Sequence, residues 1–160
     1  MKKFLLVVLG LLFILPVFGN TAELEILGSV AGFLSIASDV TTATITLDPT
    51  AGVDTHAVAV ITERSNKPGG YEVKVSSDKE WQLVAWNESE YNTKFFIPYT
   101  FSYGGTWVNP QNGAEVTVTD TQGRTTGTGV DKTFVLHTNT PEDQAAGDYR
   151  DTLTFTISSK

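Results

Sequence analysis

The feature that most constrains the fold is an alternation of apolar and polar side chains that recurs in short runs. Near the C-terminus, Leu153, Phe155 and Ile157 alternate with threonine and serine. This period of two is that of a β-strand, in which successive side chains point to opposite faces. Further strand-like runs lie at 44–47, 57–61, 71–76, 81–85, 100–103, 116–119 and 134–136. Turn residues follow the runs, so the sequence predicts an all-β sandwich or barrel of short strands.

Helix signals are confined to one segment near the C-terminus. Thr140 suits a helix cap, Pro141 suits the first helical position, and Gly147 suits a helix end. The sequence therefore predicts one short helical turn at 141–146, which connects the last two strands. The final strand is expected to begin near Tyr149. Turns are predicted at 66–70, 104–105 and 112–113, where glycine, proline and asparagine gather.

The N-terminus has the layout of a secretory signal peptide. Lys2 and Lys3 precede the apolar run 4–15, and Pro16 and Gly19 follow it. The run is shorter than the roughly 20 residues that a membrane-spanning helix needs. We expect residues 1–19 to be a signal peptide and residues 20–160 a single exported domain without a membrane span. Cleavage after Ala22 and an uncleaved anchor are the alternatives.

Composition narrows the classes of partner. The chain has 11 basic and 18 acidic residues, for a formal charge of −7, and loss of Lys2 and Lys3 makes the mature charge more negative. An acidic surface argues against nucleic acids and anionic membranes as partners. The chain has no cysteine, so an exported form would be held by its core alone, without disulfide bonds.

No set of residues has the spacing of an active site. His56 and His137 are the only histidines, and no nearby acids show metal-ligand spacing, so a structural role is favoured for both. Asp148 and Asp151 flank Tyr149, where turn capping is favoured over a calcium site. Nucleophile elbows and phosphate-binding loops are absent from the sequence. We therefore expect a non-enzymatic protein without metal or cofactor.

Aromatic residues concentrate between positions 81 and 107. This stretch contains three tryptophans as well as several tyrosines and phenylalanines. Most are expected to face the core, where large rings bury much apolar area. Trp86 and Trp107 stand next to polar turns and are the residues predicted to be exposed. A stacking platform for a sugar or peptide is the alternative for this set.

The C-terminal stretch GDYRDTLTFTISSK, residues 147–160, resembles the last strand of chaperone–usher pilins and of spore-coat-U-like secreted proteins. Gly147 is the fourteenth residue from the C-terminus, and Leu153, Phe155 and Ile157 follow the alternating pattern of those families. Residues 65–77 and 97–99 resemble their middle strands. Ser159 stands where many pilins have an aromatic residue. The resemblance implies an immunoglobulin-like antiparallel β-sandwich of about 7–10 strands.

The resemblance also implies how such a protein is used. Those families polymerise at the bacterial surface by donating a strand to another subunit, with help from a periplasmic chaperone. The contact strand would contain Gly147, Tyr149, Leu153, Phe155 and Ile157. The donor segment would contain Leu24, Ile26, Gly28 and Val30, and the period-two face that they share continues through Gly32, Leu34 and Ile36. The alternative is that this segment forms the protein's own first strand.

A second resemblance leads to a different function. Trp81-Gln82-Leu83, together with the terminal run 153–157, is similar to the motifs of WxL cell-wall-binding domains, although Phe155 stands where those domains have a tryptophan. This resemblance implies a monomeric module of the cell envelope that binds the wall or a carbohydrate.

Overall fold

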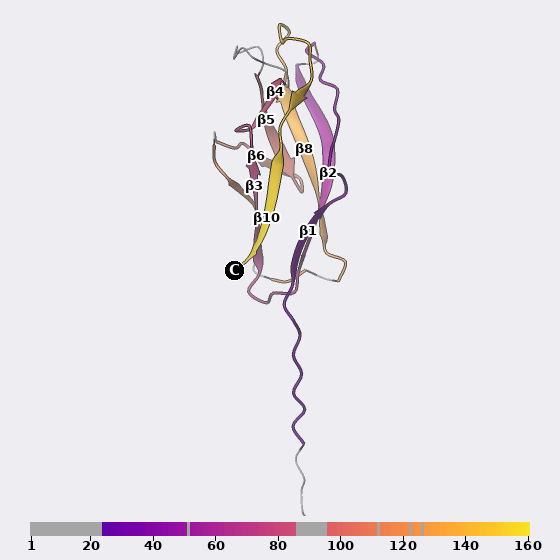
Figure 1. Cartoon of the computed structure of the whole chain (residues 1–160), viewed down its shortest axis with the longest axis vertical. Coiled ribbons are helices and arrows are strands. Elements are labelled where there is room, and N and C mark those ends of the chain that lie inside the picture. The colour runs from indigo at the N-terminus through magenta and orange to yellow at the C-terminus, as the bar shows by residue number, and fades with distance from the viewer. Residues whose placement is uncertain (1–23, 51, 86–95, 112, 122, 126) are drawn as a thin grey trace, which may run out of the picture. The chain divides into compact units, whose positions relative to one another are not determined.

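The computed structural model describes residues 24–50, 52–85, 96–111, 113–121, 123–125 and 127–160. In these ranges the chain forms ten β-strands and no helix (Figure 1). The strands are β1 (Leu34–Ser38), β2 (Val53–Ser65), β3 (Tyr71–Ser77), β4 (Gln82–Ala85), β5 (Phe96–Tyr103), β6 (Thr106–Val108), β7 (Val116–Thr121), β8 (Val130–Asn139), β9 (Tyr149–Arg150) and β10 (Leu153–Ser159).

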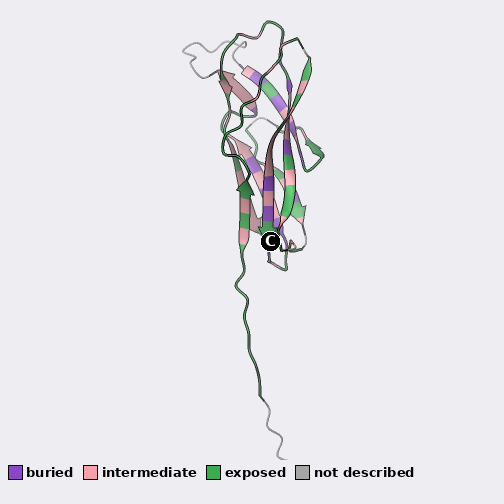
Figure 2. Cartoon of the chain, turned by 90° about the vertical axis from the view of Figure 1, so that its right-hand side faces the viewer, coloured by how far each residue is buried: buried purple, intermediate pink, exposed green. Residues whose placement is uncertain are grey.

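The strands form two antiparallel sheets, and the fold is the expected immunoglobulin-like sandwich. The larger sheet has the order β1-β2-β8-β5-β4-β9, and β6 pairs with β5. The smaller sheet has the order β10-β3-β7. β5 pairs with β8 along one edge, while β4 and β6 share its other edge. Residues alternate between more and less buried along the strands, as a sandwich requires (Figure 2).

Two glycine turns set the local connections as the sequence predicts. Gly104 and Gly105 both have positive φ angles, of 55° and 83°, and they join Tyr103 of β5 to Thr106 of β6. A two-residue hairpin needs such angles, which glycine adopts without a Cβ clash. Gly70, at φ 89°, closes the turn between β2 and β3 by donating its N–H to the Lys67 carbonyl at 3.2 Å.

The core lies between the sheets and is rich in aromatic rings. Phe101 packs against Trp81 at 5.5 Å and against Phe134 at 5.0 Å between ring centroids. The buried apolar side chains come from both sheets: Ile61, Tyr71, Val73, Val75, Trp81, Ile97, Tyr99, Phe101, Tyr103, Phe134 and Leu136. The interpretation that most aromatics face the core is therefore correct for those the structure describes.

One carboxylate is fully buried in this core. Glu63 of β2 has no exposed surface and accepts hydrogen bonds from the hydroxyls of Tyr71, Tyr103 and Thr119 at 3.0, 2.7 and 2.7 Å. The donors belong to β3, β5 and β7, so the carboxylate ties the two sheets together. Three donors satisfy much of the hydrogen-bonding capacity of a buried carboxylate.

Three sequence-based predictions of local structure are wrong. Residues 44–47 form no strand. The segment 141–146 is a turn rather than a helix, closed by a 3.0 Å bond from the Gln144 N–H to the Pro141 carbonyl. A segment this short cannot offset the cost of helix nucleation, and the hydroxyl of Tyr149 donates to the Ala145 carbonyl instead.

The third wrong prediction concerns the last strand. Tyr149 belongs to β9 of the larger sheet, whereas β10 of the smaller sheet begins at Leu153. One predicted strand is therefore two strands that belong to different sheets. The alternation of Leu153, Phe155 and Ile157 with exposed threonines holds within β10.

Residues 31–160 form one compact unit, to which residues 24–30 do not belong. Residues 24–30 contain no strand or helix. Among the described residues, no helix has the length and hydropathy to cross a membrane. The predicted signal peptide, residues 1–19, and Trp86 lie outside the described residues.

Candidate functional site

Two strand edges lie side by side without pairing to each other. β1 is the last strand at one end of the larger sheet, and β10 is the last strand at one end of the smaller sheet. Their residues are in contact, and their ribbons run next to each other in Figure 1. In the described part of the chain, each pairs with one neighbour, β1 with β2 and β10 with β3. The outer backbone groups of both strands are therefore free to pair with another strand.

Five apolar side chains line these two edges, and all are only half-buried. They are Leu34, Ile36, Leu153, Phe155 and Ile157, and we call them the open seam. Phe155 contacts Tyr103 and Phe134, with ring centroids 6.0 and 5.8 Å apart, yet the residue is only half-buried. Positions at the centre of the sandwich, such as Val73 and Val75, are fully buried. The open seam is thus an incompletely covered side of the core.

Asp151 lies in the segment that connects β9 to β10, where the chain passes from the larger sheet to the smaller one, and its hydrogen bonds fix this segment. Asp151 accepts a hydrogen bond from the Ser77 hydroxyl at 2.6 Å, another from the Lys79 N–H at 3.1 Å, and a third from the Tyr99 hydroxyl. Gly147 and Tyr149 precede this corner rather than lying in β10. Of the predicted contact residues, Leu153, Phe155 and Ile157 share one strand, and the other two do not.

The candidate donor segment exposes its apolar residues. Leu24, Ile26 and Val30 are 83%, 85% and 89% exposed, and Leu27 is 83% exposed. The compact unit begins just after this segment: the Ala31 carbonyl accepts a hydrogen bond from the Asn66 amide at 2.9 Å, and the Phe33 N–H donates to the same side chain at 2.7 Å.

A second feature lies on the outer face of the larger sheet. Trp107 of β6 is 57% exposed, and its ring packs on His137 of β8 with centroids 4.2 Å apart. His137 is fixed from both sides, because Nδ1 lies 3.2 Å from the Thr55 hydroxyl and Nε2 lies 3.3 Å from the Ser102 hydroxyl. The histidine therefore positions the tryptophan.

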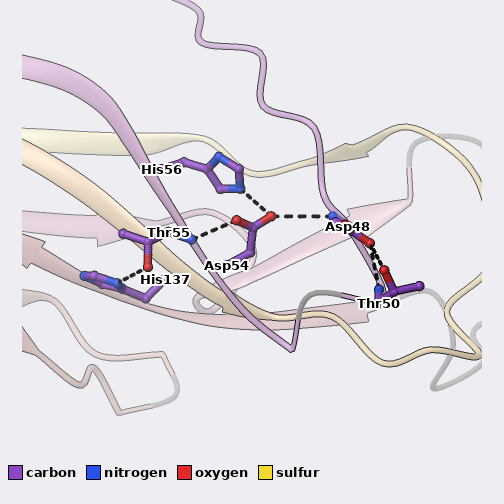
Figure 3. Close-up of polar contacts among 6 residues, drawn as sticks. All are labelled: Asp48, Thr50, Asp54, Thr55, His56 and His137. Carbon is purple, nitrogen blue, oxygen red and sulfur yellow. Dashed lines mark hydrogen bonds and ion pairs between the residues drawn. The ribbon is translucent and has the colours of Figure 1, made fainter.

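The other histidine also has a structural partner, as Figure 3 shows. His56 Nε2 lies 2.8 Å from Asp54 Oδ2. Burial acts to raise the pKa of Asp54, but hydrogen bonds from His56 and from the Asp48 and Thr55 N–H groups outweigh it, and the pKa lies below its usual value. Within the described ranges, no group of three or more histidine, cysteine or acidic residues is placed to hold a metal ion.

A groove of about 390 Å³ adjoins Trp107. Its walls are formed by Val53, Glu80, Trp81, Gln82, Pro98, Tyr99, Thr100, Trp107, Asn109, Pro110, His137, Thr138 and Asn139. Sequence reasoning singled out Trp107 but missed the polar residues beside it. The lining as a whole comes from five strands and the connecting loops, so no local spacing in the sequence brings its residues together. Trp81, from the WxL-like motif, is buried, and its indole N–H donates to the Ala114 carbonyl at 3.2 Å.

Comparison with known proteins supports the fold alone. No family model and no curated protein matches the sequence. A chain in the solved structure of a chaperone–tip adhesin complex, described as vital for synergistic activation of CFA/I fimbriae biogenesis, is similar in fold, with a TM-score of 0.53 and 14% sequence identity. The similarity covers 79% of this chain and 41% of that chain.

Proposed function

We propose that this protein is a non-enzymatic structural subunit of the bacterial cell surface, fimbria-like, which assembles by strand exchange. The observation that carries the proposal is the open seam. Two unpaired strand edges lie side by side, and the apolar side chains between them are half-buried. An extended segment from another subunit would pair with an edge and cover those side chains at the same time.

The chain carries a segment of suitable chemistry. Leu24, Ile26 and Val30 would present one apolar face in an extended conformation, and Gly28 would allow close approach to the acceptor strands. Their high exposure leaves this face available for burial elsewhere. The partner is a second copy of this chain or a related subunit. The resemblance of the C-terminal strand to pilins adds a periplasmic chaperone as a transient partner.

The export expectation fits this role. A signal peptide at 1–19 would deliver the chain to the periplasm or the cell surface. There, an uncovered seam in a protein without disulfide bonds would be prone to non-specific association until a strand fills it.

The test is the oligomeric state of the mature protein, residues 20–160, measured by light scattering over a range of concentrations. We expect oligomers that grow with concentration. Removal of residues 20–30 should give a folded monomer, because the compact unit begins at Ala31.

A matched pair of substitutions distinguishes strand donation from non-specific association. Ile26→Asp places a charge on the proposed donor face and should abolish the oligomers. Ser29→Asp adds the same charge on the opposite face and should leave most of the assembly. A monomer at every concentration, or equal effects of the two substitutions, would contradict the proposal and favour the monomeric wall-binding or carbohydrate-binding module.

A further inference from the structure

The groove beside Trp107 has no role in the proposed assembly, because neither β1 nor β10 contributes to its walls. Its residues come from the middle of the strand order of the larger sheet, β2, β8, β5 and β4, from β6, and from the connecting loops. Its described lining combines apolar and aromatic side chains with several polar ones, as small-ligand sites do.

The exposed ring is held in place before any ligand arrives. Trp107 is 57% exposed, but its contact with His137 and the two hydroxyls on that histidine restrict its orientation. A tryptophan fixed in this way offers a flat apolar surface at little cost in side-chain entropy.

The polar side chains around the ring have hydrogen-bonding capacity to spare. Gln82, Asn109 and Asn139 contribute amides, each of which presents both a donor and an acceptor. Thr138 is 1% exposed, and its hydroxyl has no hydrogen-bond partner among the described residues. Buried hydroxyls are normally paired, so this one has hydrogen-bonding capacity that no described residue uses.

The charge of the groove disfavours anionic ligands. Among the described lining residues, Glu80 is the one carboxylate, and there is no lysine or arginine. A phosphate would meet no lysine or arginine side chain of the described lining. A proline-rich peptide would need several exposed rings, whereas Trp81 and Tyr99, the other aromatics of the described lining, are 3% and 5% exposed. A sugar needs one ring for its C–H face and amides for its hydroxyl groups.

One wall of the groove is strained. Glu80 and Trp81 are consecutive non-glycine residues with φ angles of 55° and 66°, a conformation that is unfavourable for bulky side chains. The strain is held by bonds from the Trp81 N–H to the Ser77 hydroxyl at 2.7 Å and from the Gln82 N–H to the Lys79 carbonyl at 3.2 Å. Strained backbone of this kind clusters at binding sites, and here it places Gln82 at the groove.

We infer that this groove binds a neutral carbohydrate, with Trp107 stacking on the sugar ring and Gln82, Asn109 and Asn139 binding its hydroxyl groups. The inference does not depend on strand exchange, and either one could fail without the other.

The test measures binding of the full mature chain to a panel of neutral disaccharides: cellobiose, maltose, lactose, mannobiose and N,N′-diacetylchitobiose. Tryptophan fluorescence and isothermal titration calorimetry give the affinity. We expect at least one sugar to bind, and Trp107→Ala to weaken that binding about tenfold or more, as loss of a central aromatic contact does. Trp107→Phe should restore part of the affinity, because it keeps an aromatic face.

Phe33→Ala is the matched control. Phe33 is also an exposed aromatic, at 43%, but lies outside the groove lining, so its removal should leave sugar binding unchanged. Circular dichroism checks that each variant is folded. The inference is wrong if no sugar of the panel binds at millimolar concentration, if Trp107→Ala binds as tightly as the unchanged protein, or if a polyproline peptide binds at Trp107 and the sugars do not.

Discussion

At the scale of single residues, the buried hydroxyl–carboxylate contacts make the fold sensitive to alkaline pH. Burial, and then the charge and hydrogen bond of Glu63, raise the pKa of Tyr71 to about 12. The pKa of Tyr103 is raised by burial and the same carboxylate. The pKa of Tyr99 is raised by burial and then by Asp151. Each hydroxyl donates to a carboxylate, so its loss of a proton would place two negative charges together.

The direction of the pH effect follows from these shifts. In the unfolded chain a tyrosine loses its proton near pH 10, whereas the folded chain keeps these three protons to higher pH. The contribution of these three protonated tyrosines to the free energy of unfolding is fully present below pH 10. The free energy of unfolding should therefore fall as the pH rises from about 10 towards 12.

Urea denaturation at a series of pH values measures this loss, and ultraviolet absorbance of tyrosinate follows the ionisation. We expect the absorbance of the buried tyrosines to appear together with unfolding. Ionisation of all the tyrosines near pH 10 in a protein that stays folded would contradict the prediction. Tyr103→Phe, which removes one of the three protons, should make the pH dependence less steep.

At the scale of elements, Asp151 holds the passage from β9 to β10. Its carboxylate oxygens accept hydrogen bonds from the Ser77 hydroxyl, the Lys79 N–H and the Tyr99 hydroxyl. These hydrogen bonds connect the start of β10 to the end of β3 and to β5. Asp151→Ala would leave these donors without their charged acceptor. We expect a loss of about 2–3 kcal/mol in the free energy of unfolding, measured by chemical denaturation.

The control for this prediction is Asp148→Ala. Asp148 lies three residues earlier, just before β9, and is exposed, so its removal should change the free energy of unfolding by less than about 0.5 kcal/mol. Equal losses in the two variants would mean that charge in this segment, rather than the hydrogen bonds of Asp151, stabilises the corner.

The elements also show how far the sequence alone predicts this fold. Alternation with a buried face predicts β3 in nearly its full extent, the second half of β5, and the alternating side chains of β10 but not the residue at which β10 begins. The run 44–47 has the same alternation but forms no strand, because period two does not say whether a partner strand is present. The break at Asp151 was missed for a related reason: a change of sheet depends on the long-range contacts of Asp151 with Ser77 and Tyr99.

The two candidate sites also differ in how far the sequence alone predicts them. The side chains of β10 in the open seam lie in one continuous stretch, so a period-two pattern was enough to single them out. The groove draws Gln82 from β4 and Thr138 and Asn139 from β8. These strands are distant in sequence, and only their pairing with opposite edges of β5 brings the three residues near one another. The sequence does indicate that Glu63 is unusual, because it is an acid two residues after Ile61, on the inward face of the same strand. Its hydrogen-bond donors could not be predicted, because they come from three other strands.

At the scale of the whole molecule, the open seam predicts that the domain is less stable alone than with a donor strand. A ligand that binds only the folded state raises the free energy of unfolding by an amount that grows with its concentration, about 2.7 kcal/mol at 100 times the dissociation constant. A synthetic peptide of residues 20–30 should therefore raise the melting temperature of a chain that begins at Ala31, and the rise should grow with peptide concentration. The same peptide with Ile26→Asp should have little effect, because a buried charge without a partner is strongly unfavourable. Differential scanning fluorimetry measures both. A melting temperature that neither peptide changes would mean that residues 20–30 do not fill the open seam, and the donor would then have to come from a different chain.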